Sequence, residues 1–355
     1  MLLGDRKLAI LRTIIDDYIV TAEPIGSRTI AKKYNNEISS ATIRNEMADL
    51  EEMGYLQQLH TSSGRIPSDK AYRFYVDKLM SVKALSQKEA DYIKEVYNHK
   101  SAQLEDLLML TAKTISDMSN YTAIAIGPRP ESIKIRHIRL IPVESSFVLV
   151  VVVTDSGVVK DMLLRVQHPV EEEFLEKVSE ILNHYFKDKS FAQMSEADFE
   201  VVKDVIAHDK EFFYSLVDAI SETVEGKDGR RVYMEGMNNI LDIPEYSDIV
   251  KAREFFSLMK KKELMFDLLD NQNQKGLSIH IGEENPIEEM KSYSVITATY
   301  FVNDNVYGSV GIIGPKRMNY PKMVSLIDNV VDNLTQHIMN LTDGSQNDDG
   351  KDDKK

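Results

Sequence analysis

The sequence contains no cysteine, which excludes disulfides, thiol catalysis and every cysteine-ligated zinc or iron–sulfur site. Long hydrophobic runs are also lacking. The longest, Phe147–Val153, is far shorter than the ~20 residues that a membrane helix needs. The N-terminus does not show the basic-then-apolar pattern of a signal peptide. We therefore expect a protein of the cytoplasm, whose reducing conditions are compatible with the lack of cysteine, and no membrane partner.

The residue clusters that enzymes use are equally sparse. None of the eight histidines lies three or four positions from another, so no histidine pair could hold a metal on one helical turn. Gly308, Gly311 and Gly314 follow a spacing of three on an expected strand, which favours a bulge or close packing over a dinucleotide-binding loop. The sequence has neither a Walker A motif nor a G-x-S-x-G motif. It predicts no enzyme activity, no metal site and no cofactor.

The net charge of −14 is distributed unevenly along the 355 residues. Residues 1–80 contain 11 Lys and Arg and 11 Asp and Glu, so this segment is neutral. The remaining residues carry 32 basic and 46 acidic side chains, which account for the whole excess. A chain of this length has room for two or three domains. A neutral N-terminal module on an acidic body can still present one basic face to DNA.

The first 80 residues predict three helices and then a hairpin. Apolar residues recur at helical spacing over 6–20, and Glu23-Pro24-Ile25-Gly26 ends that helix. Ser27 can cap a second helix over 28–34, and Ser39 or Ser40 can cap a third that runs to about Met53. The expected hairpin comprises 55–59, a polar turn and 65–66, and is followed by another helix from Ser68. This order of elements is typical of a winged helix-turn-helix.

The rest of the chain predicts an α+β domain with an insertion. Helices are expected over 86–118, 169–186 and 251–270 and at the C-terminal end, before a polar tail. Strands are expected at 121–126, 133–143, 147–153, 158–166, 231–234, 277–281, 295–302 and 306–313. Because strands occur on both sides of the mixed region 188–248, that region is the expected insertion. The fold class is therefore α+β and multidomain.

The third helix carries the sharpest functional prediction. At 100° per residue, Ile43, Met47 and Leu50 share one narrow arc and must face the core. The opposite side then displays the small residues Ala41 and Ala48, which allow close approach to a groove. Among the flanking side chains, Arg44 suits guanine, Asn45 suits adenine and Thr42 suits a thymine methyl. The alternative is an ordinary solvated helix face.

Two further segments could hold the DNA backbone. Polar side chains and an arginine surround the glycine-containing hairpin turn, which suits phosphate or minor-groove contacts. The second helix offers basic and hydroxyl side chains near its N-terminus. Either segment could equally be plain polar surface. The full set of predicted DNA-binding residues is Ser27, Arg28, Thr29, Lys32, Ser40, Ala41, Thr42, Arg44, Asn45, His60, Thr61, Ser63 and Arg65.

Several long motifs resemble the family of the heat-inducible transcription repressor HrcA. They are TAEPIGSRTI (21–30), SSATIRNEMADLE (39–51), HTSSGRIPSDK (60–70), YRFYVD (72–77), IGEEN (281–285) and GIIGPKRMNY (311–320). The resemblance spans about residues 5–340 and is looser in the middle third. Departures from the family pattern are mild, namely Ala22, Ser63, Ala71 and Lys316, and none removes a predicted DNA contact.

The resemblance implies a winged-helix domain (1–80), a GAF-like domain in two parts (81–187 and 249–341) and an inserted dimerisation segment (188–248). The polar tail (342–355) falls outside the family pattern, and its composition predicts disorder. The resemblance also implies a homodimer that represses heat-shock chaperone operons through the inverted-repeat operator called CIRCE. The GroE chaperonin is the implied modulator. Two alternatives remain open: a regulator gated by a small molecule in its GAF-like domain, and an enzyme whose N-terminal module only docks.

Overall fold

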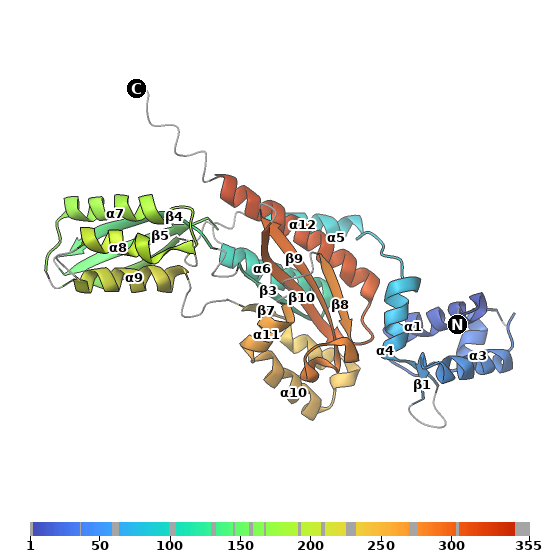
Figure 1. The fold of residues 1–355 in the computed structure, drawn as a ribbon. Coiled ribbons are helices and arrows are strands. Elements are labelled where there is room, and N and C mark those ends of the chain that lie inside the picture. Colours follow the sequence, from blue (N-terminus) through green and yellow to red (C-terminus); the bar gives the residue numbers. More distant parts are fainter. Residues whose placement is uncertain are drawn as a thin grey trace.

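The computed structural model describes residues 3–35, 37–58, 64–98, 104–128, 133–144, 146–155, 159–166, 168–190, 193–206, 210–224, 232–269, 276–302 and 305–344. These residues form three units in a row (Figure 1). An N-terminal unit (3–79) lies at one end and a distal unit (133–224) at the other. The central unit lies between them and is built from residues on both sides of the distal unit in the sequence.

The N-terminal unit confirms the predicted order of three helices and a hairpin. Its buried seam comprises Ile10, Leu11, Ile14 and Ile15 of the first helix, Ile30 of the second, and Ile43, Met47 and Leu50 of the third. Gly54, at φ +78°, ends the third helix in the left-handed conformation that favours glycine. The elements are α1 (Asp5–Thr21), α2 (Ser27–Lys33), α3 (Ser40–Glu52), β1 (Leu56–Gln57), β2 (Ile66–Pro67), α4 (Asp69–Phe74) and a π-helical turn (Tyr75–Leu79).

The central unit is built on a five-stranded antiparallel sheet with the order β7-β3-β10-β9-β8. Its strands are β3 (Thr122–Ile126), β7 (Val232–Glu235), β8 (Leu277–Ile281), β9 (Tyr293–Val302) and β10 (Asn305–Pro315). Its helices are α5 (Gln87–Asn98), α6 (Leu104–Ser119), α10 (Ile249–Met259), α11 (Lys262–Leu269) and α12 (Tyr320–Gly344), with 3₁₀ turns at Met237–Asp242, Pro244–Tyr246, Gly282–Glu284 and Glu288–Met290.

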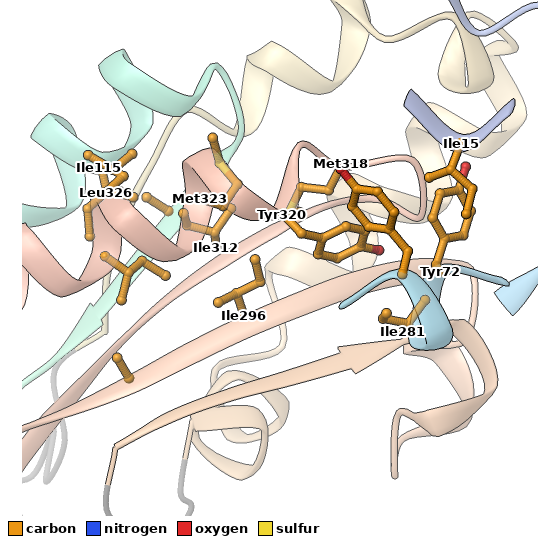
Figure 2. Packing of buried hydrophobic residues seen from close by; sticks show 14 of the residues in the cluster. Ile15, Tyr72, Ile115, Ile281, Ile296, Ile312, Met318, Tyr320, Met323 and Leu326 are labelled. Atoms are coloured by element: carbon orange, nitrogen blue, oxygen red, sulfur yellow. The ribbon is translucent and has the colours of Figure 1, made fainter. Parts of the chain in front are cut away.

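Helices cover both faces of this sheet, which is why its strands are apolar on both sides. On β3, Ala123 and Ala125 pack toward α6 and α12, whereas Ile124 and Ile126 belong to the core shared with α10 and α11. This alternation is the period of two that a pleated strand imposes. The core beneath α12 continues into the N-terminal unit without interruption (Figure 2).

The distal unit has its own three-stranded antiparallel sheet and its own core. The strands β4 (Ile135–Glu144), β5 (Phe147–Thr154) and β6 (Val159–Arg165) form a meander, and the helices are α7 (Glu172–Phe186), α8 (Glu196–Val205) and α9 (Lys210–Val224). Residues from Ile135 to Ile220 pack into one hydrophobic cluster between the sheet and the helices.

The position of the separate unit differs from the predicted insertion at 188–248. The strands over 135–165 do not join the central sheet, and β7, which falls inside the predicted insertion, does. The predicted boundary at 187/188 also divides α7 from α8, although both contribute to the distal core. Apolar alternation identifies a strand but not its partner, because pairing joins residues far apart in the sequence.

Two predicted helices are divided, and one is longer than expected. The 86–118 stretch forms α5 and α6, and the 251–270 stretch breaks between Met259 and Lys262. The last helix continues to Gly344, into the tail predicted from 342; residues 345–355 lie outside the described part of the chain. Among the described helices, none is long and apolar enough to cross a membrane.

Candidate nucleic-acid interface

The outer face of α3 presents the side chains that the sequence predicted. Ala41, Arg44, Asn45 and Ala48 are exposed, whereas Thr42 and Ser40 are half-buried. Ser39 caps the helix, since its Oγ accepts a hydrogen bond of 3.1 Å from the Thr42 amide. Within the described residues, neither Arg44 nor Asn45 has a hydrogen-bond or ion-pair partner. Their polar groups are therefore available to an external ligand.

The acidic side chains of α3 are mostly paired within the N-terminal unit. Lys7 Nζ of α1 lies 2.8 Å from Glu46 Oε2 and 2.9 Å from Asp49 Oδ2. These two carboxylates raise the pKa of Lys7. Glu51 Oε2 lies 2.7 Å from Arg65 Nε of the hairpin. Pairing reduces the negative charge that a phosphate backbone would meet close to Arg44.

The hairpin is held against α3 and the segment before α2. Leu56 pairs with Pro67 and Gln57 with Ile66 in the two-stranded ladder. The backbones of Ile25 and Arg65 exchange two hydrogen bonds of 2.9 Å. The side chain of Arg65 forms the ion pair with Glu51 described above, a contact that the sequence did not predict. The predicted contacts His60, Thr61 and Ser63 lie outside the described residues.

The predicted α2 contacts differ in accessibility. Arg28, Thr29 and Lys32 are exposed, but Ser27 is buried. The N-cap position belongs to Gly26, so Ser27 does not cap the helix as predicted. Within the described residues, Arg28 and Lys32 form no ion pair, and they are therefore the α2 side chains free to contact phosphate.

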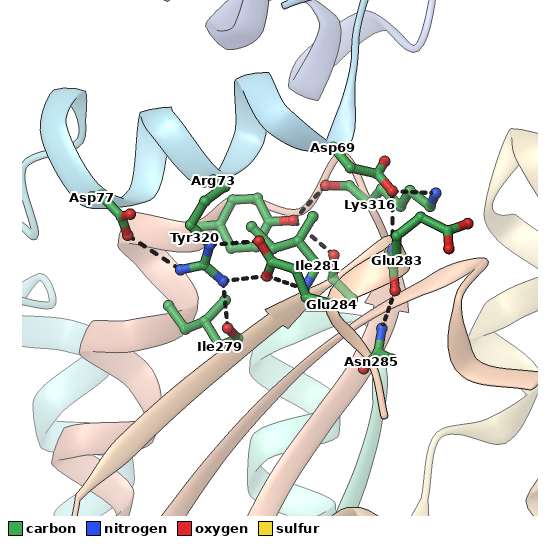
Figure 3. Close-up of polar contacts among 12 residues, drawn as sticks. Asp69, Arg73, Asp77, Ile279, Ile281, Glu283, Glu284, Asn285, Lys316 and Tyr320 are labelled. Carbon is green, nitrogen blue, oxygen red and sulfur yellow. Dashed lines mark hydrogen bonds and ion pairs between the residues drawn. The ribbon is translucent and has the colours of Figure 1, made fainter. Parts of the chain in front are cut away.

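A second polar cluster, missed by the sequence reasoning, joins the N-terminal unit to the central unit (Figure 3). Arg73 Nε of α4 donates to Glu284 Oε1 at 2.8 Å, and Nη2 donates to Glu284 Oε2 at 2.5 Å. Lys316 Nζ lies 2.8 Å from Asp69 Oδ2. We call these four side chains the junction clasp. The hydrogen bond and ion pair with Arg73 lower the pKa of Glu284 against the effect of burial.

Further contacts flank the junction clasp. Arg317 forms an ion pair with Glu245 and donates from Nη1 to the Ile19 carbonyl at 3.0 Å. The rings of Tyr72 and Tyr320 pack 6.1 Å apart, with Ile15 beside them (Figure 2). Tyr72 is buried and its hydroxyl has no hydrogen-bond partner in the described part of the chain. The two units therefore share apolar as well as ionic contacts.

A cavity of about 350 Å³ lies at the same junction. Its lining combines α1, the 81–85 linker and the segment that opens α12. The lining residues are Arg12, Asp16, Tyr75, Ser81, Lys83, Ala84, Leu85, Glu89, Asn319, Pro321 and Lys322. Over the described ranges, no cluster of three or more His, Asp or Glu side chains could hold a metal ion.

Comparison with known proteins gives the family. A family model described as the HrcA protein C terminal domain matches residues 105–324. The heat-inducible transcription repressor HrcA of Ruminiclostridium cellulolyticum is 41% identical over 347 residues, covering 97% of this chain and 99% of that protein. This chain belongs to the HrcA family. The HrcA of Caldanaerobacter subterraneus subsp. tengcongensis is 42% identical over 347 residues and covers 96% of this chain and 99% of its own length.

The fold of this HrcA family member also occurs in a crystal structure described as that of a hypothetical protein at 2.2 Å resolution. The two are 23% identical with a TM-score of 0.64, and the match covers 96% of this chain and 100% of the other. The predicted HrcA motifs 281–285 and 311–320 both reach the junction with the N-terminal unit, through Glu284 and Lys316. They contact α4 rather than α3.

Proposed function

We propose that this chain is a DNA-binding transcription repressor of heat-shock genes. Relatives named heat-inducible transcription repressor HrcA match it over nearly their full length, which supports this function. A repressor acts where its DNA is, so we place the chain in the cytoplasm. The relatives carry the name of a repressor and not of an enzyme.

The observation that carries the proposal is the outer face of α3. Arg44 and Asn45 are exposed there, opposite the buried seam of Ile43, Met47 and Leu50. An arginine can pair with guanine and an asparagine with adenine in the major groove, and the small side chain of Ala41 permits a close approach. We assign residues 3–79 as a winged helix, with α3 as the recognition helix and the hairpin as the wing.

The phosphate backbone would be held by α2 and the hairpin. Arg28, Thr29 and Lys32 are the exposed α2 side chains for this role. Arg65 would contribute only by leaving Glu51 or through guanidinium hydrogens that the ion pair does not use. These contacts position the protein on DNA, whereas α3 reads the bases.

We propose that the repressor is a homodimer formed through the distal unit, as an insertion in a GAF-like central unit. The distal helices cover one face of its sheet, and the other face carries an apolar row beside charged residues. Ile141 of β4 lies beside Leu149 of β5, which lies beside Leu163 of β6. Ile141 and Leu163 are 41% and 52% exposed, and no described residue covers them. Burial of this row against its copy would remove apolar area from water.

A two-fold dimer matches an operator of inverted-repeat symmetry. Each recognition helix would then read one half-site of the CIRCE type, and the two half-sites would be related as the subunits are. The GroE chaperonin is proposed as the modulator of repressor activity. That part rests on the family resemblance alone.

The proposal is tested by fluorescence anisotropy with three duplexes: an inverted-repeat operator, a single half-site and a scrambled sequence of equal length. Titrations at two salt concentrations, with and without chaperonin, separate base readout from phosphate attraction. We expect the operator to bind far more tightly than the scrambled duplex. Equal affinity for all three duplexes would contradict the proposed function.

The second candidate is gating by a small molecule, and the junction cavity favours it. A ligand between α1 and the start of α12 would contact both the N-terminal and the central unit. Arg12 pairs with Asp16 and Lys322 pairs with Glu89, so Lys83 supplies the excess positive charge of the lining, which favours an anionic metabolite. Thermal shifts against an anion panel test this candidate, with Lys322→Ala as the variant expected to lose any shift.

A further inference from the structure

The junction clasp joins side chains that are more than 200 residues apart in the sequence. Arg73 on α4 and Glu284 on the loop after β8 form two parallel hydrogen bonds. Arg73 Nη2 also donates to the Ile279 carbonyl at 2.5 Å. Asp69 accepts from Lys316 and, at 3.1 Å, from the Glu283 amide. A bidentate arginine–carboxylate pair fixes orientation as well as distance.

The central side of the clasp is held in place by buried polar groups. Asn285 Nδ2 donates to the carbonyls of Gly282, Met290 and Tyr293 at 2.9–3.1 Å. The Tyr320 hydroxyl donates to the Lys316 carbonyl at 2.6 Å. These hydrogen bonds order the two loops that receive α4, so little further ordering is needed when α4 docks.

The fit at Gly282 is also tight. This residue has φ +55°, and a Cβ built there would lie 1.9 Å from Asp69 Oδ2. Any side chain at this position would both strain the backbone and push the α4 carboxylate away. Glycine therefore permits this close approach of the two units.

The N-terminal side of the clasp is connected directly to α3. Ser68 Oγ, at the start of α4, donates to the Gly54 carbonyl at 2.6 Å. Lys70 Nζ donates to the Met53 carbonyl at 2.8 Å. Both carbonyls lie at the C-terminal end of α3. Whatever fixes α4 on the central unit thus fixes the direction of α3 as well.

We infer that Asp69, Arg73, Glu284 and Lys316 are positioning residues that set the angle of α3 relative to the central unit, and thereby select the spacing of the two operator half-sites. This inference rests on the proposed function. In a dimer, each α3 must reach its half-site while the subunits stay joined. If α3 is held rigidly, the second half-site adds to the affinity only when the spacing of the half-sites matches the distance between the two α3 helices.

The test varies the DNA spacing and the clasp together. Operators are made with the native spacer and with about five additional base pairs, which turn one half-site to the opposite side of the duplex. We expect wild type to lose at least about tenfold in affinity on the lengthened operator. Arg73→Glu should bind a single half-site like wild type but bind both operators within about threefold of each other.

Four further variants keep the result interpretable. Glu284→Gln and Gly282→Ala weaken the same junction from the central side, and they should also reduce spacing discrimination. The charge swap Arg73→Glu with Glu284→Arg should recover most of it. Asp77→Asn is the matched control, because Asp77 contacts Arg73 at 3.2 Å from within the N-terminal unit and does not cross the junction.

A distance measurement without DNA separates this inference from the proposed function. Because the chain has no cysteine, spin labels can be placed at Glu23→Cys and Lys94→Cys alone, one on each unit. The distance distribution should be narrow in wild type and broad in Arg73→Glu. An unchanged distribution, or unchanged spacing discrimination, would overturn the inference. Failure of wild type to bind any half-site would instead contradict the proposed function.

Discussion

Arg44 and Arg65 carry the same charge, but the structure leaves only one of them unpaired. Arg65 lies against Glu51 and is 21% exposed, whereas Arg44 stands on the outer face of α3 with no partner in the described part of the chain. The helical period predicted the exposure of Arg44. It could not predict the pairing of Arg65, which depends on how the hairpin folds back onto α3.

Replacement of Arg44 by alanine should weaken operator binding by about 1–3 kcal/mol and relax the preference at one base position. Stability should change by less than about 0.5 kcal/mol, because the side chain is exposed and unpaired. Anisotropy titrations on operators with single base changes measure the first effect, and thermal denaturation measures the second. Lys32→Ala is the control: it should lower affinity on every sequence and reduce the salt dependence.

Asp198 gives a pH-dependent prediction. Lys189, at 2.8 Å, and the Ser195 amide lower the pKa of Asp198 to about 2. Because the folded pKa lies below that of the unfolded chain, the stabilisation is present above about pH 4 and is lost as pH falls toward 2. Asp198→Asn should cost about 0.5–1 kcal/mol at pH 7 through the α8 capping box, and less at pH 3.

Urea titrations at pH 7, 5 and 3 measure the difference in the free energy of unfolding between wild type and Asp198→Asn. Glu200→Gln is the matched control on the same helix, since the exposed Glu200 has Lys203 as its one ion-pair partner within the described residues. A difference that stays constant down to pH 3 would show that the charge of Asp198 does not act through its pairing.

At the scale of single elements, the sequence predicted most helices and strands but not how they pair. The β8, β9 and β10 segments and α12 were predicted because each has a continuous apolar pattern. The break between Met259 and Lys262 was not predicted, because Phe255 and Met265 are both buried and the apolar period continues on either side of the break. Partners such as Arg73 and Glu284 leave no local pattern, so the junction clasp could not be predicted.

Within α3, neighbouring residues should separate stability from recognition. Ile43 is fully buried, and Ile43→Ala should lower the free energy of unfolding by about 2–5 kcal/mol through the cavity it leaves. Chemical denaturation of the N-terminal unit measures this loss. Arg44→Ala, one position along, is the control that should keep stability. Equal destabilisation by both variants would contradict the assignment of Ile43 to the buried face of α3 and of Arg44 to the exposed face.

At the scale of the whole molecule, the three units would divide the work of the proposed dimeric repressor. The N-terminal unit offers α3, the proposed recognition helix, the distal unit offers a sheet face with an apolar row, and the central unit connects them (Figure 1). The charge follows the same division, since the first 80 residues are neutral and the rest is acidic. We therefore expect weak attraction to non-specific DNA, because phosphate contacts dominate that binding.

The dimer prediction is tested by a charge on the open sheet face. Leu163→Glu should leave the monomer folded, because this side chain is 52% exposed, and should shift the dimer toward monomer. Sedimentation velocity measures the shift, and anisotropy should show retained half-site binding with weaker operator binding. Tyr214→Glu, an exposed apolar position on α9, is the control. A monomer–dimer equilibrium unchanged in Leu163→Glu would exclude this face.

The pairing of β3 with β7 has a consequence for how the chain could be assembled from parts. Ile126, where the chain departs toward the distal unit, lies opposite Val232, where it returns. Antiparallel neighbours of this kind can be joined by a turn of about two residues. The whole excursion could therefore be excised and the gap sealed, or another fold grafted in its place, with the five-stranded scaffold still continuous.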